Sequence, residues 1–422
     1  MSKPEIYAID YGTSNSLLNG ASKNQIFSDV PIDPKSDEPS ILKSIIYAAD
    51  NKDWIFGANA IGQYIENPAH GRIFKSLKRF LPDPSFKGTT VHNQFMSVAD
   101  LVAKQLRYMR ENANEHFGVD VRRVVMGCPA VFSENEEANQ CAFDRLELAS
   151  KAAGFDEIEF CPEPIAAAYR FRSQLSEEKM VAVADFGGGT SDFTILKMGP
   201  ERFQQKDVLA LGGVSIAGDK YDSAIMKDIV SPHFGSEITY RRPMSKNQLS
   251  FPKALVRKMC SPADMVMLNR STVLDYLKEA QRFISNDDDA YKIDQLLVLI
   301  EDRQGYALFK EIEEAKISLS ENELVPLEYH YPMIDVVESV EKKQFEDASA
   351  DFTHRILRCL DETLVKAGLE SQDIDIVCLT GGTSHIPSLR LGLEQRFGDK
   401  LQLSKQFHSV AHGLADRAQS LL

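Results

Sequence analysis

Two short segments of the chain end an apolar run with an aspartate and continue into a turn rich in glycine and hydroxyl groups. Residues 5–10 lead into Asp10 and the turn at 12–16, and residues 180–185 lead into Asp185 and the turn at 187–192. Backbone N–H groups in such a turn converge on an anion, and glycine lets a phosphate oxygen approach closely. Asp10 and Asp185 could hold the waters of a Mg²⁺ ion that bridges phosphates. The two turns therefore indicate a phosphate-binding site.

The elements that position these turns occur in the same order near the start of each half of the chain. Each copy consists of a strand, an aspartate, a turn and a second strand. This repetition predicts a duplicated architecture with one hairpin in each lobe and a cleft between the lobes. A chain of 422 residues also exceeds the usual size of a single core. Because strand-like and helix-like segments alternate, we expect each lobe to be an α/β layer structure.

The expected lobes are discontinuous in sequence. We assign residues 1–178 and 400–422 to the first lobe, with an insertion at about 38–115. We assign residues 179–399 to the second lobe, with a mostly helical insertion at about 219–345, where the sequence is less regular.

One helix between the two hairpins carries marked signals at both ends. Ser133 and Glu136 have the spacing of a capping box, in which two side chains satisfy free N–H groups at the helix start. Gly154 follows Lys151 and predicts the end of the same helix.

Composition and charge argue against several classes of partner. The formal charge of −14 opposes binding along a phosphate backbone, so we expect no nucleic-acid partner. No apolar run approaches the roughly 20 residues that span a bilayer, and the chain does not begin with the apolar core of a signal peptide. The scattered cysteines form no C-x-x-C pair and are expected to be buried free thiols. We therefore expect a cytoplasmic protein without membrane contact.

Other motifs for phosphate, hydrolase or metal chemistry do not occur in the sequence. There is no G-x-x-x-x-G-K-[ST] loop, and the glycine run at 187–189 lacks the third glycine of a dinucleotide fingerprint. No G-x-S-x-G elbow and no H-E-x-x-H pair is present. His408 and His412 have helical spacing without a third ligand nearby, so we interpret both as solvent-exposed.

Six motifs together resemble the nucleotide-binding domain of the DnaK-type heat-shock chaperone family. The segments 9–16 and 185–192 look like the two phosphate motifs of that family. The other four motifs follow the family order at residues 125–132, 163–168, 313–320 and 380–387. The resemblance covers nearly the whole chain and is closest to the shorter YegD-type relatives. It implies an α/β fold of the actin-like, ribonuclease-H-like type, with two duplicated lobes and inserted subdomains.

The resemblance implies a role for each matching residue. Lys78 aligns with a catalytic lysine whose cation contacts the γ-phosphate and the attacking water. Glu163 and Asp185 would help to hold the hydrated metal, and Asp10 would complete the charge balance. The phosphate contacts and the positioning of water would come from Gly12, Thr13, Ser14, Asn15, Gly187, Gly188, Gly189 and Thr190. The remaining nucleotide contacts would come from Gly218, Glu313, Lys316, Ser320, Gly381, Gly382 and His385.

Two of these assignments have an alternative interpretation from the residues alone. Lys78 belongs to a basic group that also fits a solvated helix face, together with Arg72, Lys75 and Arg79. The spacing of Glu313, Lys316 and Ser320 supports one shared helix face that binds ribose and base, but an ordinary charged helix surface has the same spacing.

Some positions depart from the family pattern. His385 replaces an arginine that lies over the adenine ring, and Phe407 replaces an aspartate near the nucleotide. Glu137 replaces an arginine that relays the lobe state, and Ala217 replaces a glycine. Pro129 matches a switch proline of the family. These positions bear on purine affinity and on the coupling between the lobes.

The resemblance implies a slow Mg²⁺-dependent ATPase that binds ATP and ADP, with K⁺ as a further candidate cofactor. ATP and ADP would favour different closures of the lobes, and the nucleotide state would control a protein partner. Family members continue into a peptide-binding β-sandwich, and this sequence stops at Leu422, so we expect no peptide clamp. Two alternatives stay open, a small-molecule kinase of the same superfold and a non-catalytic nucleotide-sensing or assembly protein.

Overall fold

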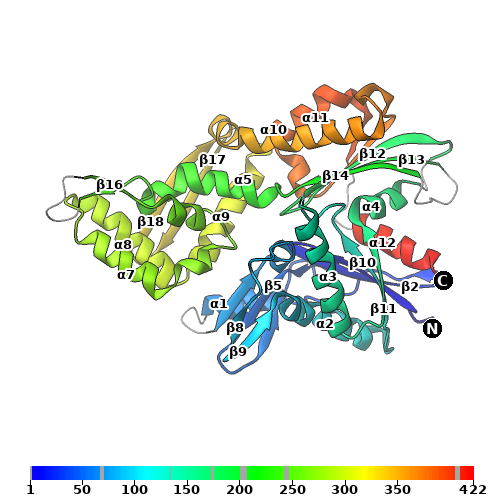
Figure 1. Cartoon of the computed structure of the whole chain (residues 1–422), viewed down its shortest axis with the longest axis horizontal. Coiled ribbons are helices and arrows are strands. Elements are labelled where there is room, and N and C mark those ends of the chain that lie inside the picture. Colours follow the sequence, from blue (N-terminus) through cyan, green and yellow to red (C-terminus); the bar gives the residue numbers. More distant parts are fainter. Residues whose placement is uncertain are drawn as a thin grey trace.

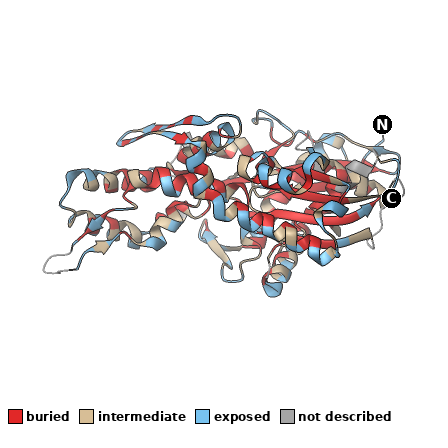
Figure 2. Cartoon of the chain, turned by 90° about the horizontal axis from the view of Figure 1, so that it is seen from above, coloured by how far each residue is buried: buried red, intermediate tan, exposed pale blue. Residues whose placement is uncertain are grey.

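Two large sheets form the centre of the molecule, and helices α4 (Glu163–Arg172) and α12 (Ser409–Ser420) lie between them (Figure 1). We call residues 45–97 the first arm and residues 218–341 the second arm. Buried residues gather along the central strands (Figure 2). The computed structural model describes residues 2–66, 71–133, 135–172, 175–199, 207–241, 247–403 and 409–422.

The first sheet has the strand order β11-β10-β1-β2-β3, with the short strand β4 also paired to β2. β1 pairs antiparallel with β2 and parallel with β10, which pairs parallel with β11. Alternate side chains of β1 face opposite layers, because Ile9 belongs to the core beneath α2 and α3 whereas Ala8 belongs to the core shared with α12. The bounds are β1 (Ile6–Tyr11), β2 (Asn15–Ser22), β3 (Gln25–Ile26), β4 (Leu42–Lys43), β10 (Arg123–Cys128), β11 (Glu157–Pro162), α2 (Val98–Phe117) and α3 (Glu136–Ala152).

The second sheet repeats this arrangement in the order β14-β13-β12-β19-β20. β12 pairs antiparallel with β13 and parallel with β19, which pairs parallel with β20. Helix α10 packs on the outer face of this sheet, where Leu360 joins the core that contains Phe193. The predicted duplication is therefore present. The bounds are β12 (Lys179–Phe186), β13 (Ser191–Met198), β14 (Val208–Val214), β19 (Ile376–Thr380), β20 (Leu401–Leu403), α10 (Lys342–Ala367) and α11 (Pro387–Phe397).

Helices α4 and α12 join the two sheets through one shared apolar core. This core takes Ala8 from the first sheet, Val183 from the second, and Ala166 and Leu414 from the two helices. The helices approach so closely that a Cβ added to Gly413 would lie 1.7 Å from the Ala166 carbonyl oxygen. The junction between the sheets is therefore tightly packed.

Both arms are insertions between elements of the sheets. The first arm consists of β5 (Ile45–Ala48), β6 (Trp54–Phe56), α1 (Gly57–Glu66), β7 (Arg72–Lys75), the 3₁₀ helix η1 (Leu77–Phe80), β8 (Gly88–Val91) and β9 (Gln94–Ser97). The described elements of the second arm are α5 (Gly218–Ile225), η3 (Met226–Val230), η4 (Ser231–Phe234), β15 (Thr239–Tyr240), β16 (Leu249–Ser250), α6 (Lys253–Met259), η5 (Met265–Leu268), α7 (Ser271–Gln281), α8 (Asp287–Glu301), α9 (Gly305–Ser318), β17 (Leu324–Tyr331) and β18 (Ile334–Glu341). The regular hairpin β17–β18 was not predicted from the sequence.

Three details differ from the sequence analysis. β20 pairs with β19, so it belongs to the second sheet, and we propose that the return to the first lobe begins with α12 rather than at residue 400. Asn135 caps α3 instead of Ser133, because the helix starts at Glu136 and the Asn135 side chain accepts from the Ala138 N–H at 2.9 Å. His412 is half-buried, with Nε2 3.3 Å from Asp29 Oδ1, because α12 packs against the first sheet. His408 lies outside the described residues.

Two other expectations concern thiols and membranes. The cysteines are free, and four of them are buried, namely Cys128, Cys161, Cys260 and Cys378, whereas Cys141 and Cys359 are half-buried. None of the helices in the described part of the chain is long and apolar enough to span a bilayer.

Candidate functional site

The two predicted turns face each other where the two sheets meet. A Cβ added to Gly188 would lie 2.4 Å from Ser14 Oγ, and one added to Gly189 would lie 3.1 Å from Thr13 Oγ1. The hydroxyl groups of the first turn therefore lie against the bare backbone of the second turn. Residues that are 174 to 176 positions apart in sequence form one polar surface of hydroxyl and backbone groups.

The first turn is held in shape by its own backbone and by Ser44. A Cβ on Gly12 would lie 2.1 Å from the Asn15 carbonyl oxygen, so the turn requires glycine there. Ser44 Oγ donates to the Gly12 carbonyl at 2.8 Å, and the Ser44 N–H donates to the Ser14 carbonyl at 2.8 Å. Asn15 Oδ1 is buried and has no hydrogen-bond partner among the described residues. This orphaned acceptor is consistent with a donor that binds at the turn.

Lys78 and Glu163 form a buried ion pair beside the first turn. Ser76 has a left-handed backbone (φ 58°), after which η1 carries Lys78 inward. Its Nζ lies 2.5 Å from Oε1 of Glu163 at the start of α4, and Lys78 is only 6% exposed. Burial lowers the pKa of Lys78, but the carboxylates of Glu163 and Asp10 outweigh it and raise the pKa above its ordinary value. Lys78 therefore does not belong to a solvated helix face.

The two predicted aspartates differ in their surroundings. Burial, followed by the charge of Glu163, raises the pKa of Asp10 to about 8. The same two causes raise the pKa of Asp185 to about 6, and a hydrogen bond from Thr380 Oγ1 at 2.6 Å opposes the shift. Both carboxylates therefore lie where a cation would relieve the cost of their charge.

A third acid, Asp192, lies across the hairpin from Asp185 in the β12–β13 register. It is 1% exposed, and its Oδ1 accepts from the Ala130 N–H at 3.0 Å, a contact that connects β13 with the loop after β10. Burial, followed by the charge of Glu163, raises the pKa of Asp192 to about 8. Asp192 was assigned no role from the sequence, because it was placed at the end of the turn at 187–192, whereas the structure places it in β13.

The acids suit a hydrated Mg²⁺ ion better than a metal enclosed by protein ligands. Among the described residues, no group of three or more His, Cys, Asp or Glu side chains is arranged to hold a metal ion. Mg²⁺ keeps several of its waters and is usually held by one or two carboxylates together with phosphate oxygens. The oxygen donors of Asp10 and Asp185 fit that mode of binding.

Part of the predicted nucleoside site also comes together. Lys316, on α9, lies with Nζ 2.7 Å from Asp222 Oδ1, and both side chains are largely buried. A Cβ added to Gly218 would lie 3.1 Å from Thr383 Oγ1 and 3.6 Å from Lys316 Nζ. Thr383 in turn donates to the Gly187 carbonyl at 2.8 Å. The start of α5 and the end of α9 are thereby connected to the second turn.

The other predicted nucleoside residues are arranged less closely. Glu313 is exposed on α9, and Ser320 lies beyond the last residue of that helix, so the three predicted residues do not share one continuous helix face. Gly382 and His385 are exposed on the turn after β19. Gly381 has φ 80°, and a Cβ there would lie 2.0 Å from the Phe186 carbonyl oxygen. Phe407 lies outside the described residues.

Three hydroxyl groups that support the site were not predicted from the sequence. Ser44, Thr380 and Thr383 each donate to an element of the two turns or to Asp185. Thr380 and Thr383 belong to the motif at residues 380–387, and their position beside glycines was the signal that could have identified them. No signal in the sequence pointed to Ser44, because it reaches the first turn from the bend between β4 and β5, 32 residues after Gly12.

Comparison with known proteins supports the predicted fold class. The family model described as Hsp70 protein matches residues 9–255 and 283–420, which together make up most of the chain. This match and the duplicated sheets confirm the α/β, actin-like fold of two lobes with inserted subdomains.

Individual relatives are distant and longer than this chain. Chaperone protein dnaK of Cyanidioschyzon merolae is 24% identical over 409 residues, which cover 92% of this chain and 56% of the relative. DnaK of Mycoplasmopsis agalactiae is 23% identical over 416 residues, with 96% and 56% covered. DnaK of Halobacterium salinarum is 25% identical over 413 residues, with 95% and 53% covered. The chain thus spans about half the length of these relatives. On the strength of the family match, the chain belongs to the Hsp70 family.

Proposed function

We propose that this chain binds ATP and ADP with Mg²⁺ between the two turns and hydrolyses ATP slowly. The observation that carries the proposal is the convergence of Thr13 and Ser14 on Gly188 and Gly189, beside the buried Lys78 ammonium. Backbone N–H groups, hydroxyls and a cation are the groups that bind a polyphosphate. Membership of the Hsp70 family supports ATP as the ligand, and the names of the relatives, which are chaperones, support a chaperone-like role.

The residues of the site have distinct proposed tasks. Lys78 contributes the positive charge that stabilises the developing charge on the transferred phosphoryl group, and Glu163 fixes its position through the 2.5 Å ion pair. Thr13, Ser14 and Thr190 orient phosphate oxygens and the attacking water. Most of the catalysis would come from positioning and charge rather than from covalent chemistry.

Asp10 and Asp185 would hold the hydrated Mg²⁺, which supplies charge neutralisation of the phosphates when bound. Asp192 would support this pair from the adjacent strand. K⁺ is a further candidate cofactor of the same acidic region.

We further propose that the nucleotide state controls how the two lobes close and thereby acts on a protein partner, as a chaperone-like module. The contact of Asp192 with the Ala130 N–H supports this part, because it joins the second sheet to the loop beside Pro129. ATP and ADP would shift lobe closure only through different contacts with the two turns. We propose a cytoplasmic location.

The test is Mg²⁺-dependent phosphate release by the wild type and by Lys78→Ala. We expect Lys78→Ala to lower the rate by roughly a hundredfold or more, since a group that stabilises transition-state charge contributes on that order. Lys87→Ala, an exposed lysine of the first arm, serves as the control and should leave the rate unchanged. Circular dichroism should show that each variant is folded.

Two results would count against the proposal. An unchanged rate in folded Lys78→Ala would remove Lys78 from the site. A rate that rises strongly with one member of a panel of sugars and polyols would instead indicate a small-molecule kinase.

A further inference from the structure

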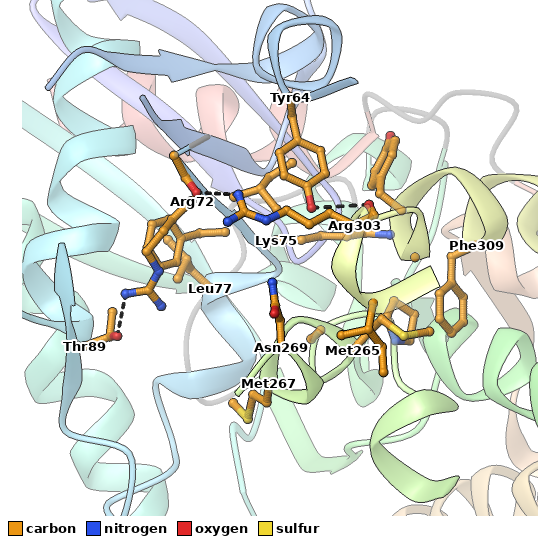
Figure 3. A pocket seen from close by; sticks show the side chains of 18 of the residues that line it. Tyr64, Arg72, Lys75, Leu77, Thr89, Met265, Met267, Asn269, Arg303 and Phe309 are labelled. Carbon is orange, nitrogen blue, oxygen red and sulfur yellow. Dashed lines mark hydrogen bonds between the residues drawn. The ribbon is translucent and has the colours of Figure 1, made fainter. Parts of the chain in front are cut away.

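A cavity of about 370 Å³ lies between the two arms (Figure 3). β7 and η1 of the first arm form one side of it, and η5 with the start of α9 forms the other. The arms also meet directly around it, since Arg303 Nη1 donates to the Gly71 carbonyl at 2.6 Å and Arg79 Nη2 lies 2.9 Å from Asp264 Oδ2. The volume is within the range of about 300–1,000 Å³ that small-molecule sites occupy.

The lining combines aromatic walls with cations. The aromatic residues are Tyr64, Phe74, Phe80, Phe86, Tyr306 and Phe309, and the cations are Arg72, Lys75, Arg270 and Arg303. No Asp or Glu lines the cavity among the described residues. In a chain with a formal charge of −14, such a concentration of positive charge in one cavity indicates an anionic ligand.

Arg72 and Lys75 form no ion pair with an Asp or Glu side chain in the part of the chain that the structure describes, although the charge of Lys75 acts on Asp219 and opposes the rise in the pKa of that acid. Arg72 Nη1 donates to Thr89 Oγ1 at 2.9 Å and its guanidinium lies 5.1 Å from the centre of the Phe74 ring. Lys75 Nζ lies 5.7 Å from the centre of the Tyr306 ring, so it reaches across from the first arm to the second. Burial, and then the charge of Arg303, lowers the pKa of Arg72. An anion bound in the cavity would offset the repulsion between the charges of Arg72 and Arg303.

The cavity differs from the proposed nucleotide site. None of the residues that we assign to phosphate, metal, ribose or base lines it. Its wall from Pro262 to Arg270 falls in the segment between the two ranges matched by the Hsp70 family model, residues 256–282. This wall therefore belongs to the part of the second arm that the family model does not describe.

We propose that the cavity binds a small aromatic anion, a planar ring that carries one carboxylate, sulfonate or phosphate group. The ring would lie against the aromatic side chains, and the anionic group would bind Arg72 and Lys75 through charge-assisted hydrogen bonds. Because the walls come from both arms, the bound anion bridges them.

The test uses a matched pair of probes, 2-naphthalenesulfonate and the neutral 2-naphthalenesulfonamide, in calorimetric titrations of the full chain without nucleotide. We expect the sulfonate to bind at least roughly tenfold more tightly than the sulfonamide, because hydrogen bonds to charged groups exceed neutral ones by about that factor. Arg72→Gln and Lys75→Gln should each weaken sulfonate binding by roughly five- to tenfold and change sulfonamide binding by less than about twofold.

Lys253→Gln, an exposed position elsewhere in the second arm, removes the same charge and should leave both probes unaffected. Sulfonamide binding shows in each variant that the aromatic walls are intact. The proposal is overturned if the wild type binds both probes equally, or binds no sulfonate at millimolar concentration. It is also overturned if both variants lose the two probes to the same extent, because the charges would then only support the walls.

Discussion

The two halves of the molecule share one strand order but surround their aspartates differently. In the first sheet, Asp10 lies opposite Leu17, and in the second sheet Asp185 lies opposite Asp192. Thr380 on the parallel neighbour β19 donates to Asp185 at 2.6 Å. Met126 on β10 pairs with Ile9, the residue before Asp10. The next residue on β10 is Gly127, which has no side chain that could donate a hydrogen bond.

This difference shows that two sheets with the same strand order can stabilise a buried aspartate in different ways. In the second half, the Thr380 hydroxyl group offsets part of the free-energy cost of burying the Asp185 carboxylate. In the first half, Asp10 has no such hydroxyl donor among the described residues and lies near Lys78, a cation that Glu163 already holds at 2.5 Å and that also acts on Asp185. Burial raises the pKa of both acids, which lies at about 8 for Asp10 and at about 6 for Asp185. The pKa of Asp10 is higher because the charge of Glu163 there outweighs that of Lys78, whereas the hydrogen bond from Thr380 lowers the pKa of Asp185. Of the two aspartates that precede the turns, Asp10 is therefore the one whose charge gains more from a bound cation.

The largest expected effect comes from the equivalent first glycines of the two turns. We expect Gly12→Ala to lower the free energy of unfolding by about 2–3 kcal/mol, because its Cβ would lie 2.1 Å from the backbone oxygen of Asn15. Gly187→Ala should cost less than about 1 kcal/mol, since the nearest atom to its Cβ is 3.5 Å away. Urea unfolding without nucleotide measures both. Equal losses in the two variants would mean that the turns are not constrained differently.

The pH dependence of stability should separate the two aspartates. Each has a folded pKa above the ordinary value of 3.8, so the folded state binds more protons and stability falls as pH rises from 3.8 toward the folded pKa. That decline extends to about pH 8 for Asp10 and to about pH 6 for Asp185. We expect Asp10→Asn to reduce the decline between pH 6 and 8 by on the order of 2 kcal/mol, and Asp185→Asn to leave most of it.

Urea unfolding at pH 5, 6, 7 and 8 without Mg²⁺ checks this expectation. Asp192, whose pKa is raised to about 8, contributes to the same window and should preserve part of the slope in both variants. A slope between pH 6 and 8 that Asp10→Asn leaves unchanged would contradict the assignment.

The smallest expected effect concerns the hydroxyl that only the second half supplies. Thr380→Val removes the donor to Asp185 with little change of shape and should cost about 1 kcal/mol at pH 7. Thr194→Val in the same sheet is the matched control, since Thr194 Oγ1 is buried without a hydrogen-bond partner among the described residues. That control should be neutral or slightly stabilising. If both variants lose the same stability, the hydrogen bond to Asp185 has no special value.

Sequence reasoning predicted the features that depend on local pattern. The order of strand, aspartate and glycine turn at Asp10 and at Asp185 predicted both hairpins. The repetition of this order predicted the duplicated sheets. The pairing of Lys78 with Glu163 depends on the left-handed backbone at Ser76 and on the docking of η1 beside α4, which no local pattern encodes. Only the family resemblance pointed to Lys78.

Other features were missed because a local signal competed with the correct one. Pro326 lies inside β17, and proline argues against a strand, although Val325 and Leu327 alternate with exposed residues there. Ser133 has the spacing of a cap, but Asn135 lies immediately before the helix and takes that position. In β17 the packing of Val325 and Leu327 in the core outweighs the proline, and at α3 the residue next to the helix start takes the cap.

Calorimetric titration with ATP, ADP and AMP, each with and without Mg²⁺, tests the central claim most directly. If the two turns bind phosphates and the acids of the site hold Mg²⁺, ATP and ADP should bind more tightly with Mg²⁺ than without it, and both should exceed AMP. Absence of ATP binding at millimolar concentration, or equal binding of AMP and ADP regardless of Mg²⁺, would contradict the claim.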